Sequence, residues 1–363
     1  MSTLPASEDR RASPEPFLPG SDDDRKRWIF ALALLLGTWI PMACLIAVGW
    51  SDAPGVGLET AKAALVFVNS LHVAATIWLY VDRRFLRVMA QHRARYVYAP
   101  LAVVLASGTV FTLAGPEVQA YWMLVYWAWQ AYHYGRQNVG IYSFASIAEG
   151  RCAERAARWP LELATACAIC GTFQILGAEV SPGYLRALFE NLYRVGAVAF
   201  AGVVVLGAFT YLRRIRESSP LQAAFFFTLL LFFAPIFLST NPIVAFSSYA
   251  VAHGIQYMVI VSVLAGSLVV KDGRRGVSGR MTILLGGMIL LGVAAYLKAA
   301  GWGESTLLLR GALDFAAGMV LGTAAAHFIV DAGAWRLSEP PIRAYMASRF
   351  GFLLGPARPG PRA

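Results

Sequence analysis

Ten segments of this chain are each apolar over the length of a bilayer-spanning helix, and this feature restricts the fold more than any other. A spanning helix needs about 20 predominantly apolar residues. Backbone polar groups inside lipid must find partners within the protein, so the segments predict helices rather than open sheets. We expect an all-α, polytopic membrane helix bundle with about ten transmembrane helices, at residues 28–50, 58–81, 97–114, 119–146, 160–178, 193–212, 221–239, 243–270, 281–299 and 306–335.

The composition agrees with an integral membrane protein. Of the 363 residues, 58% are hydrophobic and only 14% are charged. A soluble domain of this length needs more charge to cover its surface. We therefore divide the chain into a disordered cytoplasmic tail at 1–27, a transmembrane helical domain at 28–336 and a second cytoplasmic tail at 337–363.

A net charge of +10 is common in proteins that bind nucleic acid, but the positions of the basic residues argue against such a partner. These residues gather in alternate connections between the apolar segments, as the positive-inside rule describes for cytoplasmic loops. We expect a multi-pass protein of the cytoplasmic (inner) membrane, with both termini in the cytoplasm and with membrane lipids around it. The basic connections are 25–27, 83–95, 151–158, 213–216, 271–280 and 336–349.

Four histidines lie inside apolar segments, one per segment: His72, His133, His253 and His327. Their segments are all even-numbered, so the predicted topology runs each of them from outside to inside. The histidines lie 12 to 17 residues from the outer polar edge of their segments. At about 1.5 Å per residue this scatter is roughly 8 Å, which predicts one shared layer. Ionisable side chains at such depth are rare and usually mark a functional site.

Each histidine has a polar residue one helical turn away. A metal-bound imidazole normally donates its second N–H to a neighbouring carboxylate, carbonyl or amide, and these residues supply such groups. Asn69 and Thr76 accompany the first histidine, and Gln130 accompanies the second. We predict the four histidines as metal ligands. The candidate catalytic residues beside them are Gln137, Gln256, Tyr257 and Asp331.

The donor set restricts the metal. The CxxC pair Cys167 and Cys170 lies in the fifth apolar segment, away from the histidines, and is interpreted as ordinary packing. Imidazole with at most one carboxylate suits iron, copper or zinc. Iron held by three or four histidines with open positions is suited to dioxygen chemistry. We therefore predict a metal-dependent oxygenase, with Fe²⁺ as the metal and a hydrophobic, lipid-soluble small molecule as the substrate.

The late stretch His327-Phe328-Ile329-Val330-Asp331, together with intramembrane histidines on separate helices, resembles the bacterial membrane carotenoid-cleaving dioxygenases (the Brp/Blh family) and their multi-histidine relatives. The resemblance covers four short stretches of the chain. It implies an iron site formed by the four histidines and a hydrophobic polyene substrate. The chain departs from the membrane desaturases and hydroxylases, because it has none of their HxxxH or HxxHH clusters.

Three alternatives remain open from the sequence. Histidines on facing helices are the axial ligands of haem b, and four of them would hold two haems. Histidines and glutamines also line the polar paths of proton-coupled or solute transporters. A single intramembrane histidine more often forms a hydrogen bond between helices than a metal bond.

Arg136 lies three residues after His133, deeper than a charged residue is expected in a span. Two explanations fit the sequence. Arg136 either pairs with Asp331, or the helix unwinds near Gly135 and Gly140.

Overall fold

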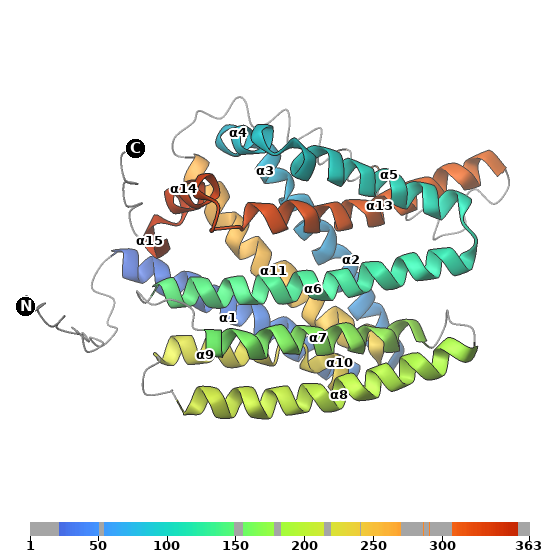
Figure 1. Cartoon of the computed structure of the whole chain (residues 1–363), viewed down its shortest axis with the longest axis horizontal. Helices are drawn as coiled ribbons and strands as arrows, with labels where there is room; N and C mark the ends of the chain where they lie inside the picture. Colours follow the sequence, from blue (N-terminus) through green and yellow to red (C-terminus); the bar gives the residue numbers. More distant parts are fainter. Residues whose placement is uncertain are drawn as a thin grey trace, which may run out of the picture.

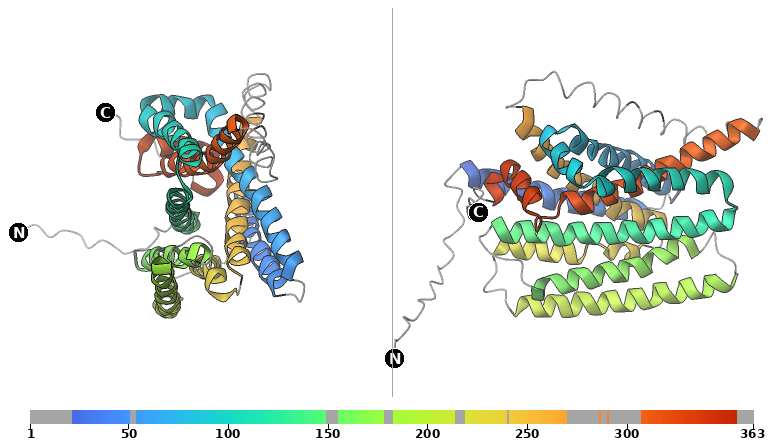
Figure 2. Two further views of the ribbon diagram at one scale, coloured as in Figure 1. Left: turned by 90° about the vertical axis from the view of Figure 1, so that its right-hand side faces the viewer. Right: turned by 45° about the horizontal axis from the view of Figure 1, so that its top comes forward.

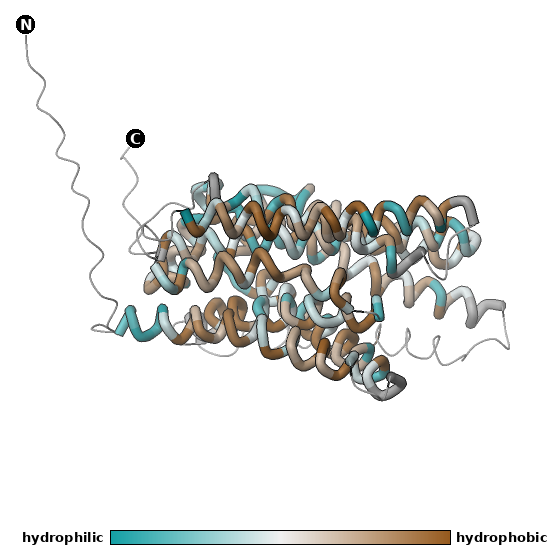
Figure 3. Tube along the Cα trace, turned by 90° about the horizontal axis from the view of Figure 1, so that it is seen from below, coloured by the Kyte–Doolittle hydropathy of each residue, from teal (hydrophilic) through white to brown (hydrophobic). Residues whose placement is uncertain are grey.

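The computed structural model describes residues 22–50, 54–148, 155–177, 183–213, 219–239, 241–269, 286, 290 and 307–354. These residues form helices joined by short connections, with no strand among them, which confirms the all-α fold (Figure 1). Hydrophobic residues predominate along the long helices (Figure 3). Large apolar side chains face outward, among them Val66, Phe67 and Val198, which are 66–76% exposed. A soluble monomer rarely exposes such a surface, whereas lipid covers it.

The first half of the chain forms six α-helices and one π-helical turn. Their bounds are α1 Asp22–Gly49, α2 Pro54–Ala75, α3 Ile77–Val81, α4 Arg83–Gln91, η1 Ala94–Tyr98, α5 Ala99–Leu113 and α6 Pro116–Ala148. The second half supplies the remaining described helices. Their bounds are α7 Arg155–Gly177, α8 Gly183–Leu212, α9 Pro220–Leu230, α10 Ala234–Leu238, α11 Pro242–Val269, α13 Leu307–Ala334, α14 Pro340–Arg349 and α15 Gly351–Leu354.

Six of the described helices are long and apolar enough to cross a membrane, so the ten predicted spans are confirmed in part. Helices α6 and α7 cover the fourth and fifth predicted spans but are not among the six. The ninth predicted span, 281–299, lies almost entirely outside the described residues. The six helices are Asp22–Gly49, Gly57–Val81, Ala94–Leu113, Leu185–Leu212, Pro242–Ala265 and Gly311–Ala334.

Two predicted spans are interrupted. The segment predicted at 221–239 divides into α9 and α10 at residues 231–233, directly before Pro235. A proline ring clashes with the carbonyl four residues earlier, here that of Leu231, and this ends the first helix. The segment predicted at 58–81 turns at Thr76, where the backbone N–H of Thr76 donates to the Val73 carbonyl at 3.2 Å. This tight turn separates α2 from α3, four residues beyond His72.

Helix α6 lies between the α5–α13 pair and the α7–α8 pair, and Figure 2 shows the same order from other sides. Helix α11 packs between α1 and α2. Two of these contacts need glycine. A Cβ built on Gly254 would lie 2.6 Å from Val68 Cγ1, so only glycine lets α11 approach α2 beside the histidines. Gly318 and Gly322 similarly bring α13 against the backbone of α5, as small residues four apart do in membrane bundles.

The two ends of the described chain meet at one end of the bundle, where α15 packs on α1. The N–H at Nε of Arg27 donates to the Phe352 carbonyl there. The segment 337–363, predicted as a tail, thus contains two helices with buried side chains, including those of Tyr345 and Phe350. Residues 1–21 and 355–363 lie outside the described part of the chain. The cytoplasmic placement of both termini stays a prediction.

Candidate metal centre

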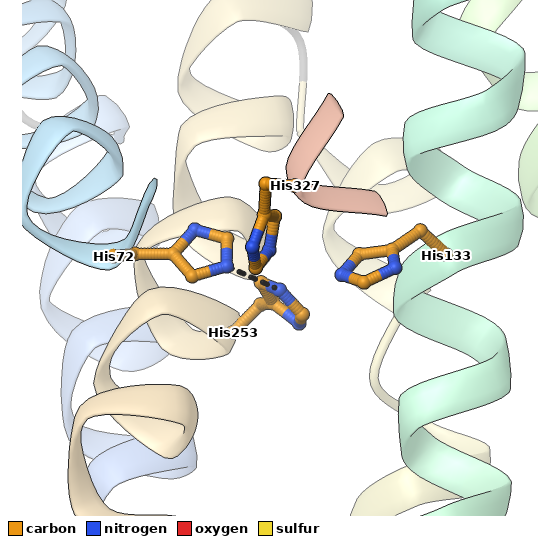
Figure 4. Close-up of side chains that lie close together, drawn as sticks. All are labelled: His72, His133, His253 and His327. Carbon is orange, nitrogen blue, oxygen red and sulfur yellow. Dashed lines mark hydrogen bonds between the residues drawn. The ribbon is translucent and has the colours of Figure 1, made fainter. Parts of the chain in front are cut away.

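The four histidines converge in the interior of the bundle, as predicted. They come from four different helices, α2, α6, α11 and α13, and their rings point toward a common centre (Figure 4). One potential ligand atom from each ring lies within 4.8 Å of those of the other three. We call His72, His133, His253 and His327 the histidine cluster. Their exposed fractions are only 1%, 7%, 0% and 2%, respectively.

The spacing within the histidine cluster fits a single ion. The Nε2 atoms of His72 and His253 lie 3.2 Å apart. Two imidazole nitrogens bound to one ion at about 2.1 Å in tetrahedral geometry lie about 3.4 Å apart, and two on opposite sides about 4.2 Å apart. The widest spacing of 4.8 Å exceeds that limit by about half an ångström. Binding of one ion by all four rings therefore requires the most widely separated nitrogens to approach one another by about half an ångström.

A chain of hydrogen bonds supports His327 from behind. The hydroxyl of Tyr257 donates to Asp331 Oδ1 at 2.9 Å. Its single proton is therefore engaged, and the 2.9 Å contact with Thr76 Oγ1 must be a bond that Thr76 donates. Thr76 Oγ1 in turn accepts from His327 Nδ1. This order of donors places the His327 proton on Nδ1 and leaves the Nε2 lone pair available for a metal.

The Asp331 carboxylate also lies next to two ring nitrogens of the histidine cluster. Its Oδ2 lies 3.6 Å from His327 Nε2 and 4.0 Å from His133 Nε2. The carboxyl is buried, with 2% of Asp331 exposed. Asp331 Oδ1 therefore accepts a hydrogen bond from Tyr257, in the chain that orients His327, whereas Asp331 Oδ2 faces Nε2 of His327 and of His133.

Aromatic rings fix the orientation of two other histidines. Tyr134 lies against His253 with ring centroids 3.8 Å apart, and Phe328 stacks on His133 at 4.5 Å. The Gln130 side-chain amide donates to the Tyr134 hydroxyl. These contacts restrict ring rotation, so both imidazoles are oriented before any ligand arrives.

One nitrogen on each ring of the histidine cluster has no hydrogen-bond partner, although it is buried. These atoms are Nδ1 of His72 and of His253, and Nε2 of His133 and of His327. An unsatisfied polar atom costs roughly 1–3 kcal/mol when buried in a protein. A metal bound through Nε2 of each ring would engage the unpartnered atoms of His133 and His327. It would bind His72 and His253 through the two Nε2 atoms that lie 3.2 Å apart and leave their Nδ1 atoms to other partners.

The remaining predicted site residues fall in different places. Tyr257 and Asp331 contact the histidine cluster, as described above. Gln256 is buried but faces α1, where its amide donates to Thr38 Oγ1 at 2.7 Å. Gln137 lines a neighbouring cavity, one turn beyond His133. Thr76, Tyr134 and Phe328 were not predicted as site residues. The sequence signals for them were the position of Thr76, one turn after His72, and that of Phe328, directly after His327.

A cavity of about 520 Å³ leads from the histidine cluster toward the surface between α6 and α13. This volume lies in the usual range for small-molecule sites, about 300–1,000 Å³. His133 and Asp331 are at its inner end, and its wall includes the rings of Trp129, Phe328 and Trp335. The cavity therefore gives a small molecule a path to His133, the histidine of the cluster that lines it.

Neither explanation offered for Arg136 is correct. Helix α6 continues without interruption through Gly135 and Gly140. The Arg136 Nη1 atom lies 3.5 Å from Glu162 Oε1 on α7, and the two side chains are 52% and 48% exposed. The guanidinium thus points outward along the mouth of the cavity and leaves Asp331 to the histidine cluster.

Comparisons of the chain with protein-family models, with curated proteins and with solved structures found no match.

Proposed function

We propose that the protein is an integral membrane oxygenase that holds non-haem iron in the histidine cluster and oxidises a lipid-soluble substrate. The observation that carries the proposal is the set of four buried imidazoles whose potential ligand atoms lie within 4.8 Å of one another, with His133 and Asp331 lining a cavity. Imidazole ligands favour iron, copper or zinc over magnesium or calcium. Among these metals, iron with an open coordination position is suited to dioxygen chemistry.

The geometry supports a single ion better than haem. A macrocycle must fit between its two axial imidazoles, yet the ring centroids of neighbouring histidines are 4.3–5.2 Å apart on every side of the cluster. The centre has no space for a porphyrin unless the helices separate.

The proposed reaction follows from the sequence resemblance to carotenoid-cleaving dioxygenases. Dioxygen would cleave one carbon–carbon double bond of a polyene and place one oxygen atom on each of two carbonyl products. Both oxygen atoms are consumed, so the reaction needs no external reductant. The bound iron would supply the binding and activation of dioxygen. The chain itself contributes the dry surroundings of the histidine cluster and the aromatic wall against which a flat polyene can lie.

The test is metal analysis and an optical spectrum of the full chain, purified in neutral detergent without chelators. We expect about one iron per chain, no Soret band, and dioxygen uptake with carbonyl products when a carotenoid is added. A Soret band would replace this proposal with a haem protein. Protein without stoichiometric metal, whose behaviour is unchanged by chelation, would favour a transporter whose histidines line a polar path.

A further inference from the structure

The mouth of the cavity beside the histidine cluster has a different character from its interior. Three arginines line it: Arg136 on α6, Arg158 on α7, and Arg336 just after α13. Asp331 is the one acidic residue among the described lining residues, and it lies at the inner end. The cavity thus has an aromatic body and a strongly cationic entrance.

These arginines are available to a ligand. Arg136 and Arg336 have carboxylate neighbours, Glu162 at 3.5 Å and Glu339 at 3.2 Å, but both guanidinium side chains are more than half exposed. Ion pairs of this kind contribute about 0–1 kcal/mol, so a ligand anion can compete for them. Arg158 is partly buried and has no carboxylate partner among the residues that the structure describes.

The cavity is elongated along α6. Its lining on this helix runs from Trp129 to Phe144. At about 1.5 Å per residue this is roughly 22 Å, long enough for an extended apolar tail. Tyr132 and Ala332, which are exposed, also line the cavity, so the ligand can enter from the side of the bundle. An apolar tail would lie between Phe328 and Trp335 and reach toward the metal.

From these features we infer that the cavity binds a single-chain amphiphile with an anionic head group, held by Arg136, Arg158 and Arg336, and an apolar tail directed toward the histidine cluster. Guanidinium groups bind carboxylate and phosphate through paired, charge-assisted hydrogen bonds. That this amphiphile is the molecule oxidised rests on the proposed function. Its binding in the cavity does not require bound iron.

The test measures binding of trans-parinaric acid, a fluorescent polyene carboxylate, to the purified full chain in neutral detergent. We expect the acid to bind at least about tenfold more tightly than its methyl ester, which has the same tail without the charge. Arg158→Gln should weaken binding of the acid about fivefold and leave the ester unchanged. The matched control is Arg93→Gln, an exposed arginine outside the cavity, which should change neither.

Displacement identifies the head group. Palmitate or a lysophosphatidate that displaces the probe supports an anionic amphiphile, and their relative strength distinguishes a carboxylate from a phosphate head. Displacement by inorganic phosphate alone would show a site for a free anion and would overturn the inference. Equal binding of acid and ester, in the wild type and in Arg158→Gln, would also overturn it.

Failure of this inference and failure of the proposed function remain distinguishable. His253→Ala, at a histidine that does not line the cavity, should lose iron yet retain probe binding in the same assay. If the protein contains iron but binds the acid and the ester equally, the anionic head group is wrong and the oxygenase proposal is unaffected. If the protein prefers the acid but contains no iron, the head-group inference holds and the oxygenase proposal fails.

Discussion

Two groups of polar side chains are buried in this apolar bundle, and they differ in how fully they are hydrogen-bonded. The first, which we call the Asp82 cluster, consists of Asp82, Tyr345 and Arg349. Asp82 Oδ1 accepts from the Arg84 backbone at 2.8 Å. Asp82 Oδ2 accepts from the Tyr345 hydroxyl at 2.8 Å and from Arg349 Nη2 at 2.9 Å. The second group, the histidine cluster, leaves a nitrogen without a partner on each of its four rings.

We interpret this difference as one of role: the Asp82 cluster stabilises the fold, and the histidine cluster is a candidate ligand site. The Asp82 cluster joins α14 to the start of α4, and its carboxylate is neutralised where it lies. Burial, together with the neighbouring Asp82 carboxylate, raises the pKa of Tyr345, so its hydroxyl remains a donor at neutral pH. The histidine cluster has oriented rings and a nitrogen without a hydrogen-bond partner on each of them, as expected of a ligand-binding site.

The largest effect should come from removing a ring of the histidine cluster. We predict that His253→Ala or His133→Ala abolishes stoichiometric metal binding and leaves the protein in the membrane, because each ring supplies one of only four donors. Metal analysis of the purified variants measures this. His92→Ala, at a partly exposed histidine outside the bundle interior, is the control and should retain metal. Full metal content in either cluster variant would remove that residue from the ligand set.

The Asp82 cluster should show the opposite response. Asp82→Asn leaves the guanidinium of Arg349, whose side chain is 4% exposed, without its counter-charge. Breaking a buried ion pair from one side costs about 3–5 kcal/mol. We expect a lower free energy of unfolding in detergent, with normal metal content per folded molecule. A variant that loses metal while keeping its stability would invalidate the division of roles.

A smaller effect is expected at Asp331, which contacts the histidine cluster without completing it. Asp331→Asn should weaken iron affinity about 10–100-fold, as the loss of an orienting partner usually does. Membrane insertion should be unaffected. Iron affinity, measured by competition with a chelator, tests this. Affinity equal to the wild type would show that the carboxylate does not orient the ligands.

The smallest effect should come from the hydrogen-bond chain behind His327. Thr76→Val and Tyr257→Phe each remove two hydrogen bonds of this chain. Because they act on the metal only through the orientation of His327, we expect a loss of about 1 kcal/mol, roughly fivefold in iron affinity. The matched control is Gln256→Met, beside Tyr257 in sequence but bonded to Thr38 on α1. Gln256→Met should lower stability by a similar amount and leave iron affinity unchanged. An equal loss of affinity in all three variants would mean a general loosening of α11.

The helical fold and the meeting of the four histidines could be predicted from sequence, because hydropathy gives the positions of the helices. The direction of each predicted span and the depth of its histidine then predicted that the four histidines lie in one layer. The interruptions at Thr76 and at residues 231–233 were missed, because hydropathy does not register a turn inside an apolar segment. Pro235 was the available signal for the second of them.

The roles of neighbouring polar residues were harder to predict. Gln256 and Tyr257 follow His253 by three and four residues, so both were assigned to the site. Successive residues on a helix differ in direction by about 100°, and only Tyr257 faces α2 and α13. Asp82 and Arg349 are 267 residues apart, and no local pattern relates them.

The histidine cluster also determines when during the protein's synthesis the site can exist. His72 and His327 are separated by 255 positions in the chain (327 minus 72). At about 5–20 residues per second, a ribosome takes roughly 10–50 s to pass from one to the other. The nascent chain therefore enters the membrane without a complete set of donors, and an ion held by all four histidines could bind only after α13 has been translated and inserted.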